Sequence, residues 1–281
     1  KTYNIRMVAY SGATCSSDDN ITVTVNAMPN VVFNDIRSVC LEDPSFQLTQ
    51  AIETAGLAPG ISGGYYSGTG ITSSSGIFDP SVAGAGTHTI LYKFTSTAGC
   101  EDTASNTITV HPMPTVDADR GQQWVMLEGG QLILDPIVTG NELSYLWTHD
   151  LGGSNSFLSS PIIRNPVATP VQDITYTLTV TGRGGCKTSD DIFIKVLKVP
   201  AIPNTFSPNG DGINDKWVIK YLDTYPSCKI KVFTRTGQLV FQSYGYRTPW
   251  NGTMSGKTLP LDTYYYIIEP ESGRKPYTGY V

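Results

Sequence analysis

Short segments in which apolar and polar residues alternate dominate this sequence. The alternation is clearest at 21–25, 90–94, 174–180 and 192–196. A period of two residues predicts β-strands that bury one face. Over no long window do apolar residues recur at the three- and four-residue spacing of an amphipathic helix. The pattern therefore predicts an all-β protein.

One arrangement of strands and turn occurs three times. The segments are AYSGATCSSDDNITVTVNAMPNV, KFTSTAGCEDTASNTITVHPMPTV and TVTGRGGCKTSDDIFIKVLKVPAI. In each, a cysteine is followed fourteen residues later by a proline: Cys15 and Pro29, Cys100 and Pro114, and Cys186 and Pro200. Each reads as a strand, a turn, the cysteine, and a second strand that ends at proline, which has no N–H for a ladder. The repeat predicts a β-hairpin that closes a module and leads into a linker.

The spacing of these cysteines predicts the domain organisation. A module of about 85 residues with short alternating strands suits a seven-stranded immunoglobulin-like sandwich. We therefore predict tandem immunoglobulin-like β-sandwich domains: residues 1–28 as the last strands of a truncated module (the first segment), 29–113 (the second module), 114–199 (the third module) and 200–281 without the repeat (the last domain). The first residues lack the apolar region of a signal peptide, so we expect a piece of a longer protein.

Composition and charge narrow the classes of function. Charged residues make up 15 % of the chain, and its 28 glycines and 18 prolines suit many tight turns. The formal net charge is −5 without any Lys/Arg run, so no nucleic-acid partner is predicted. There is no apolar run of about 18 residues, so no direct membrane span is expected.

Two cysteines suggest a pairing inside one module. Cys40 lies early and Cys100 lies late in the second module. An early strand and the closing hairpin of a sandwich can face each other across the core, so we predict a Cys40–Cys100 disulfide. In the chain-entropy model it contributes roughly 4 kcal/mol, and it favours an oxidising compartment.

The other cysteines are expected to lack a partner within the chain. WVMLEGG in the third module matches SVCLEDP in the second, which places Met126 where the second module has its early cysteine. Cys186 then has no partner, and Cys15 is expected to pair upstream. We interpret Cys186 and Cys228 as buried apolar residues rather than nucleophiles.

The two modules resemble a known class of repeat. YYSGTGITSSSGIFDPSVAGAGTHTILYKFTSTAGCEDTASNTITV in the second module is similar to the PKD-like and immunoglobulin-like repeats of large Bacteroidetes surface proteins. SYLWTHDLGG and NPVATPVQDITYTLTVTGRGGC in the third module look like a variant. The resemblance implies that Tyr145 and Trp147 lie on a core strand, and it implies no particular ligand.

The last domain resembles a more specific family. IPNTFSPNGDGINDKWVI, CKIKVFTRTGQLVFQS and PWNGTMSGKTLPLDTYYYIIE follow in the order found in the type B sorting domain of type IX secretion, the gliding-motility-associated C-terminal domain. The resemblance implies a small immunoglobulin-like sandwich that directs export and engages translocon components and outer-membrane β-barrels of the PorP/SprF type. Members usually finish with a further strand, so we expect an open sheet edge where this sequence stops.

One loop of the last domain partly follows a calcium-binding pattern. Ser207, Asn209, Asp211 and Asp215 fall at offsets 1, 3, 5 and 9, with glycine at offset 6. Val218, at offset 12, is no ligand. The alternative is a structural turn in which Asn and Asp side chains accept backbone N–H groups. We therefore predict a turn and keep Ca²⁺ as a candidate cofactor, with no other cofactor expected.

Aromatic residues gather near the end of the chain. Trp250, Tyr264, Tyr265 and Tyr266 are candidates for partner docking, since exposed aromatic residues mark interfaces. In a strand, Tyr264 and Tyr266 share one face while Tyr265 takes the other. We expect one of these faces to be core and the other to be available for docking. Separately, Asp102-Thr103-Ala104 matches the triplet that Bacteroidetes glycosylate, which makes Thr103 a candidate O-glycosylation site, with an unmodified turn as the alternative.

No pattern in the chain predicts catalysis. The three histidines are far apart, no GxSxG motif occurs, and the carboxylate pairs recur at equivalent turns. The sequence predicts a non-catalytic part of a secreted protein attached at the bacterial outer membrane: stalk repeats and an export domain of a gliding or adhesion protein, with a surface glycan or substratum bound by distal regions. The alternatives are the non-catalytic tail of a secreted polysaccharide-degrading enzyme and a carbohydrate-binding module.

Overall fold

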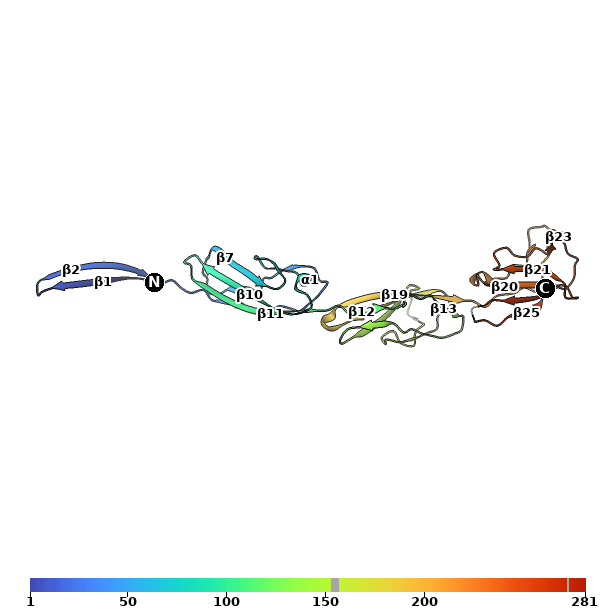
Figure 1. The fold of residues 1–281 in the computed structure, drawn as a ribbon, viewed down its shortest axis with the longest axis horizontal. Coiled ribbons are helices and arrows are strands. Elements are labelled where there is room, and N and C mark those ends of the chain that lie inside the picture. The colour runs from blue at the N-terminus through green and yellow to red at the C-terminus, as the bar shows by residue number, and fades with distance from the viewer. Residues whose placement is uncertain (153–156, 272) are drawn as a thin grey trace. The chain divides into compact units, whose positions relative to one another are not determined.

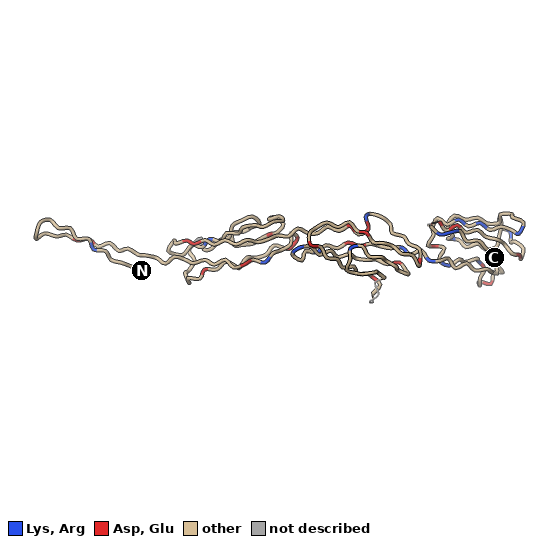
Figure 2. Tube along the Cα trace, turned by 90° about the horizontal axis from the view of Figure 1, so that it is seen from below, with Lys and Arg blue, Asp and Glu red and all other residues tan. Residues whose placement is uncertain are grey.

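The computed structural model describes residues 1–152, 157–271 and 273–281, and its regular elements are almost all strands (Figure 1). The helical elements of the described residues are single turns: α1 (Pro80–Ala83), η1 (Arg183–Gly185) and η2 (Leu222–Thr224). The all-β prediction is confirmed. No helix among the described residues has the length and apolar character that crossing a bilayer requires. Figure 2 shows Lys and Arg interspersed with Asp and Glu, without a continuous basic stretch.

The described chain divides into two compact units. The first holds residues 1–115 with the loops 139–143 and 181–188. The second holds 116–138, 144–180 and 189–281. The units cut across the third module, so the domain limits drawn from the sequence repeat stay a prediction.

The first segment is a two-stranded hairpin of β1 (Thr2–Ser11) and β2 (Cys15–Thr24). The strands are antiparallel, and the register closes with Ser11 opposite Cys15. Most of the large apolar side chains of both strands are exposed, and Val8 is half-buried. The hairpin thus has the alternation of a sandwich strand pair, and no other strand of the described residues pairs with it.

The second module is built from three small sheets. A four-stranded sheet has the order β4-β11-β10-β7, beside the pair β3-β6 and the trio β5-β9-β8. The strands are β3 (Val31–Phe33), β4 (Val39–Cys40), β5 (Phe46–Gln47), β6 (Ala51–Glu53), β7 (Pro59–Gly68), β8 (Ile71–Ser73), β9 (Ile77–Phe78), β10 (Gly86–Ser96) and β11 (Glu101–His111). The core between them includes Val39, Phe78, Ile90, Ile108 and Val110. The alternating residues of β10 and β11 thus point into this core, as the sequence predicts.

The third module repeats this plan. Its main sheet has the order β13-β19-β18-β16, with the pairs β12-β15 and β14-β17. The strands are β12 (Thr115–Asp117), β13 (Trp124–Leu127), β14 (Leu132–Ile133), β15 (Ile137–Thr139), β16 (Ser144–His149), β17 (Val167–Ala168), β18 (Ile174–Thr181) and β19 (Lys187–Leu197). Trp147 on β16 is buried, with its ring edge-on to that of Tyr176 at 6.4 Å, while Tyr145 is half-buried.

The predicted disulfide is wrong: Cys40 is bonded to Cys186, with 5.6 Å between the two Cα atoms. The reason is the direction of β4, which runs parallel to β11 and sets Cys40 opposite His111, the last residue of β11. Cys100 precedes the first residue of β11. Eleven residues at roughly 3.3 Å each separate the two ends by about 35 Å, far beyond the reach of a disulfide. Cys100 is a free, half-buried thiol, so Cys186 rather than Cys100 has the partner.

The register of the third module also corrects the place assigned to Met126. In the second module Cys40 pairs with His111, eleven residues after Cys100. In the third, the residue eleven after Cys186 is Leu197, and it pairs with Leu127. Leu127 therefore takes the place of Cys40, while Met126 is a buried core residue one position earlier.

The last domain is a smaller sandwich. Its main sheet has the antiparallel order β21-β20-β24-β25, next to the pair β22-β23. The strands are β20 (Lys229–Phe233), β21 (Leu239–Tyr244), β22 (Thr253–Met254), β23 (Lys257–Thr258), β24 (Tyr265–Glu269) and β25 (Tyr277–Tyr280). The sequence predicts an open sheet edge where it stops, and β25 is the edge strand there. Tyr264 and Val281 exchange two backbone hydrogen bonds of 2.8 Å just beyond the ladder of β24 and β25.

The end of β19 packs into the core of the last domain. Leu197 is buried among the core residues of that domain, and Leu127 packs against them. The Tyr225 hydroxyl donates to the carbonyl of Lys198 at 2.7 Å. Arg274 donates to the Leu197 carbonyl at 2.8 Å and to the Tyr225 hydroxyl. The last domain therefore begins to form its core before residue 200.

Candidate functional site

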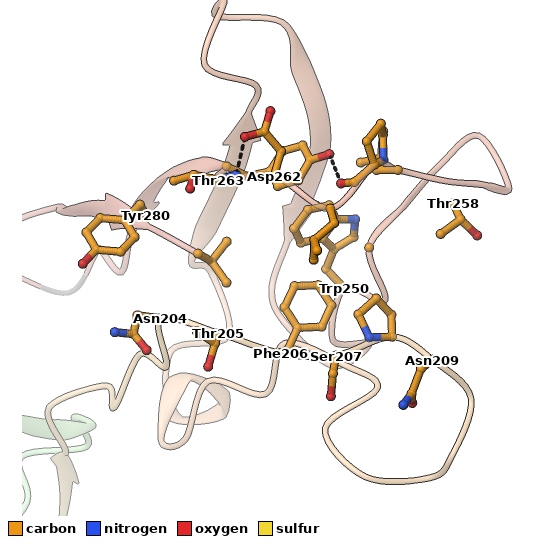
Figure 3. Close-up of a pocket in the computed structure, with 17 residues that line it drawn as sticks. Asn204, Thr205, Phe206, Ser207, Asn209, Trp250, Thr258, Asp262, Thr263 and Tyr280 are labelled. Carbon is orange, nitrogen blue, oxygen red and sulfur yellow. Dashed lines mark hydrogen bonds between the residues drawn. The ribbon is translucent and has the colours of Figure 1, made fainter.

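The last domain has an open pocket of about 520 Å³ (Figure 3). It lies between the segment that opens the domain and the segment that precedes β24. Aromatic and aliphatic side chains make up most of its wall: Phe206, Pro208, Trp250, Leu259, Pro260, Leu261, Tyr264, Tyr280 and Val281. Such a lining suits the binding of apolar side chains.

A cluster of aromatic rings builds one side of this pocket. Trp250 is only 2 % exposed, and its ring centroid lies 5.5 Å from that of Phe206. The backbones of Trp217 and Trp250 form a β-bridge in which the Trp217 N–H donates to the Trp250 carbonyl at 2.7 Å. The Tyr246 hydroxyl accepts the Trp250 N–H at 3.1 Å, and burial raises the pKa of Tyr246. These contacts hold the Trp250 ring in place.

The opposite side is formed by the segment before β24. The Tyr264 hydroxyl donates to the Pro260 carbonyl at 2.8 Å, and Asp262 accepts the Thr263 N–H at 2.7 Å (Figure 3). These bonds close a turn that leaves the side chain of Leu261 fully exposed. A fully exposed leucine beside an apolar pocket is a ready contact for a partner.

The structure brings only part of the predicted aromatic set together. Trp250 and Tyr264 line the pocket, and both are buried. Tyr265 is 47 % exposed on the other face of the sheet, while Tyr266 is half-buried with its ring 5.1 Å from that of Trp217. Tyr264 and Tyr266 thus share a face, as the strand period predicts, and the structure shows that this face is the core side. Sequence reasoning missed Leu261, because only the turn at Pro260 shows that this leucine points outward.

Residues 200–281 match the model of the CHU_C type IX secretion signal domain. The last domain is a type IX secretion signal domain. The chain is thus that of a secreted protein targeted to the type IX secretion system. A sequence comparison with curated proteins gave no match.

Solved structures that align with most or all of this chain include strings of immunoglobulin domains and of cadherin domains. The I-band fragment I67–I69 from titin aligns with a TM-score of 0.41 and 11 % identity, over 91 % of this chain and 98 % of that one. The Sidekick-1 immunoglobulin domains 1–5 align with a TM-score of 0.35 and 11 % identity, over 97 % and 64 %. The N-terminal eight immunoglobulin domains of Down Syndrome Cell Adhesion Molecule align with a TM-score of 0.35 and 13 % identity, over 98 % and 45 %.

In the secretion signal domain, the candidate calcium loop forms a network of its own. Asp215 accepts the N–H groups of Gly210 at 2.6 Å and Gly212 at 2.8 Å. Asp211 accepts the Ile213 N–H at 2.7 Å and an Asn209 amide N–H at 2.8 Å, and these two bonds lower the pKa of Asp211. Both carboxylates thus already have N–H donors, as in the predicted turn. Binding of Ca²⁺ here stays a prediction.

The Ser207 side chain also serves the loop rather than an ion. Its hydroxyl donates to the carbonyl of Ile213 at 3.4 Å, and its backbone N–H donates to the backbone carbonyl of Asn214 at 2.9 Å. Asn214 itself has a positive φ of 53°, a conformation that asparagine tolerates better than most residues. The four predicted site residues therefore share one loop, and each stabilises its backbone.

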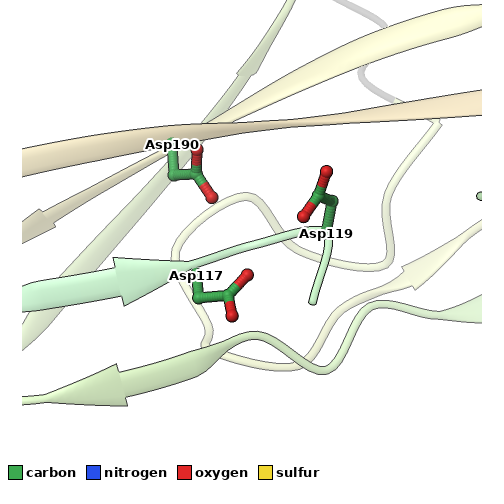
Figure 4. A group of neighbouring side chains, drawn as sticks. All are labelled: Asp117, Asp119 and Asp190. Carbon is green, nitrogen blue, oxygen red and sulfur yellow. The ribbon is translucent and has the colours of Figure 1, made fainter. Parts of the chain in front are cut away.

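A second acidic group, missed from the sequence, lies outside the secretion signal domain (Figure 4). One carboxylate oxygen each of Asp117, Asp119 and Asp190 lies within 4.8 Å of the others. Three carboxylates are a donor set that Ca²⁺ accepts. Each also accepts a backbone N–H, at 2.7 to 2.8 Å, from Arg120, Gly121 and Ala118 respectively. These bonds account for the arrangement without an ion.

Thr103, the candidate glycosylation site, lies within β11 opposite Lys93, not in a turn. Its side chain is exposed. A sugar on this residue would project from the sheet face without displacing core residues, so modification stays a prediction.

Proposed function

We propose that the secretion signal domain docks through its apolar pocket on an outer-membrane β-barrel of the PorP/SprF type, and that the immunoglobulin-like modules form the stalk of the surface protein that it carries. The match of residues 200–281 to a type IX secretion signal domain carries the proposal. The pocket supplies the chemistry, since the exposed Leu261 lies beside the buried Trp250 and Tyr264.

The expected contact is a hydrophobic one. An extracellular loop of the barrel that inserts an aliphatic or aromatic side chain would cover Leu261 and fill the pocket. A few well-packed residues at the centre of an interface, often aromatic, contribute most of its binding energy. The pocket is open, and the hydrogen bonds of Tyr246 and Tyr264 already hold its wall in place. Binding would therefore cost little conformational freedom.

The stalk role rests on the independence of the sandwiches. The second module has its own buried core between short strands, and its closing hairpin ends in a Pro-containing linker. Modules of this kind can be strung in series without assembling a catalytic cleft. The immunoglobulin-like modules and the secretion signal domain together favour a non-catalytic chain.

The docking proposal is tested with the full chain and two variants. Leu261→Asp places a charge in the proposed interface at a fully exposed position, so folding should not suffer. Tyr244→Asp is the control. Tyr244 is 72 % exposed on β21, which is the edge strand opposite β25, the strand that contributes Tyr280 to the pocket. Each protein is incubated with detergent-solubilised outer membranes of a bacterium that has a type IX system, and barrels are identified by mass spectrometry.

The expected result is a PorP/SprF-type barrel bound to the wild-type chain and to Tyr244→Asp, with affinity at least about tenfold lower for Leu261→Asp. Equal binding by both variants would exclude the pocket as the contact. Deletion of residues 200–281 should leave the protein in the periplasm, and normal export of that truncated chain would overturn the export role itself.

The other functions weighed from the sequence have separate tests. A carbohydrate-binding module needs an exposed aromatic platform. Trp147, Trp217 and Trp250 are buried, which leaves Trp124, half-buried beside the exposed Phe193, as the tryptophan that could provide it. A glycan array with the chain and with Trp124→Ala tests this role. Calorimetric titration with Ca²⁺ tests the loop at 207–215, and intact mass after export tests glycosylation of Thr103.

A further inference from the structure

The closing hairpins of the modules share one backbone geometry at their cysteines. In the second module the Ser96 N–H donates to the Cys100 carbonyl at 2.9 Å. In the third, the Gly182 N–H donates to the Cys186 carbonyl at 2.8 Å. In both hairpins the donor lies four residues before the cysteine. In the first segment, Cys15 likewise lies four residues after Ser11, with which it pairs in the ladder. The cysteine therefore occupies the same place in each hairpin.

This place lies at the entry end of a module. Two residues after Cys100, Asp102 accepts the N–H of Val31 at 2.7 Å, and Val31 begins the first strand of the second module. The early cysteine lies at the other, exit end, since Cys40 pairs with His111 just before the linker. The second module thus carries one cysteine at each end, and the two are too far apart to bond to each other.

The disulfide between Cys40 and Cys186 joins the exit end of one module to the entry end of the next. Cys186, the entry-end cysteine of the third module, is bonded to Cys40, the exit-end cysteine of the second. Cys186 is 1 % exposed in this bond, whereas the equivalent Cys100 is a free, half-buried thiol. We propose that Cys100 is the entry-end half of a second disulfide of the same kind, whose other half is a cysteine at the Cys40 position of a preceding copy of this module.

The first segment indicates what such a preceding module looks like. Ile5 and Val23 lie at the same distances from Cys15 as Ile90 and Ile108 lie from Cys100. Ile90 and Ile108 are 0 % exposed, but Ile5 is 52 % and Val23 38 % exposed. The first segment has the apolar face of a closing hairpin, but it contains only the entry-end cysteine. The early strands of a module of this repeat would cover that face and bring the exit-end cysteine.

The bond forms by oxidation of two thiols. Cys100 and the exit-end cysteine lose two protons and two electrons as the S–S bond forms. A small disulfide such as oxidised glutathione accepts them and is released as two thiols. The series of bonds stops at the exit end of the third module, because Leu127 takes the cysteine position there.

The test supplies the preceding module from the chain itself. In the tandem protein, residues 29–113 replace residues 1–28, so that the second module occurs twice before residues 114–281. The first copy carries Cys100→Ser, which leaves Cys100 only in the second copy. It also carries Ser38→Ala, a mass label at an exposed position of the peptide that holds Cys40. The protein is oxidised with a glutathione buffer, and disulfide-linked peptides are identified by mass spectrometry.

The expected result is a labelled Cys40 peptide linked to Cys100 in most of the chains, with the unlabelled Cys40 peptide linked to Cys186. The second bond shows that the tandem protein has folded. Linkage of Cys100 to the unlabelled Cys40, or alkylation of Cys100 while the bond to Cys186 is present, would overturn the proposal.

A second tandem protein is used if the bond to Cys186 fails to form in the first one. In this second protein, residues 1–113 with the same two substitutions precede residues 29–281, so the native hairpin stays in front of the first copy of the module. The labelled linkage is expected again, and its absence from both tandem proteins overturns the proposal. Cys100→Ser in the second copy is the control, and it should remove this linkage while leaving the bond to Cys186 intact.

Discussion

The chain passes from one sandwich to the next at two places that are held by different chemistry. At the end of the second module, a covalent bond joins Cys40 to Cys186. At the end of the third module, Leu197 and Leu127 pack into the core of the secretion signal domain, and Arg274 bonds to the Leu197 carbonyl. Cys40 and Leu127 occupy equivalent places in their sheets.

This difference shows that one backbone position can serve either kind of joint. A disulfide acts mainly by restricting the unfolded chain and needs only a facing cysteine. An apolar side chain needs a core that receives it, which the secretion signal domain provides around Trp217 and Tyr225. The joint chemistry therefore follows from what comes next in the chain: another module with an entry-end cysteine, or a domain without one.

The largest effect is expected from breaking the covalent joint. Cys40→Ser removes a bond between residues 146 apart, for which the chain-entropy model gives roughly 5 kcal/mol, with smaller values common in practice. Cys100→Ser removes a free thiol and should change stability by less than about 0.5 kcal/mol. Urea denaturation under oxidising conditions measures both. Equal midpoints for the two variants would show that the bond does not stabilise the folded chain.

A smaller effect is expected at the apolar joint. Leu197→Ala opens a cavity at a side chain that is only 3 % exposed, which should cost about 2–4 kcal/mol. Leu239→Ala, at an exposed position of β21, serves as the matched control. Tryptophan fluorescence, which includes the buried Trp217 and Trp250, follows the unfolding. A loss at Leu197 no larger than at Leu239 would contradict its place in the core.

Arg274→Leu should have a lesser effect at the same joint. The substitution removes the hydrogen bonds to the Leu197 carbonyl and to the Tyr225 hydroxyl, with an expected cost of about 1–2 kcal/mol. Arg247→Leu, which changes an exposed arginine of the same domain, should be close to neutral. Thermal unfolding of the two variants side by side measures the difference, and equal melting temperatures would mean that Arg274 does not hold this joint.

The smallest effect is expected at Tyr225 and depends on pH. Burial raises the pKa of Tyr225, although Arg274 opposes the rise. Because the folded state holds this proton more tightly, the stability it confers is complete below the unfolded pKa of about 10 and is lost as pH rises through the higher folded pKa. Tyr225→Phe should cost about 1 kcal/mol at pH 7, through the lost bond to Lys198, and should lessen the alkaline loss. Denaturation midpoints between pH 7 and 11 check this, and an unchanged alkaline loss would assign it to other groups.

The sequence predicts the strands well because their signal is local. The alternation at 90–94 and 174–180 depends only on which face of a strand is buried, and the structure buries Ile90 and Tyr176 as that pattern requires. The turn predicted at 207–215 likewise depends on side chains that bond to nearby backbone, and the structure confirms those bonds.

Features that depend on distant segments were predicted poorly. The pairing of Cys40 depends on the direction of β4 beside β11, and two early-strand residues cannot reveal whether that pairing is parallel. The position of Leu127 depends on the same register. The pocket at Leu261 and the acidic group at Asp119 arise where loops from separate strands meet, and no spacing along the chain records that meeting.

The Cys40–Cys186 bond also sets how the chain would respond to tension between its ends. Load applied to the backbone would pass through the S–S bond and bypass the 146-residue stretch that the bond closes. At roughly 3.5 Å per residue, about 500 Å of contour length could not be extended until the disulfide was reduced. In the stalk role proposed above, the chain would therefore stay short under pull, even if the strands inside the closed stretch came apart.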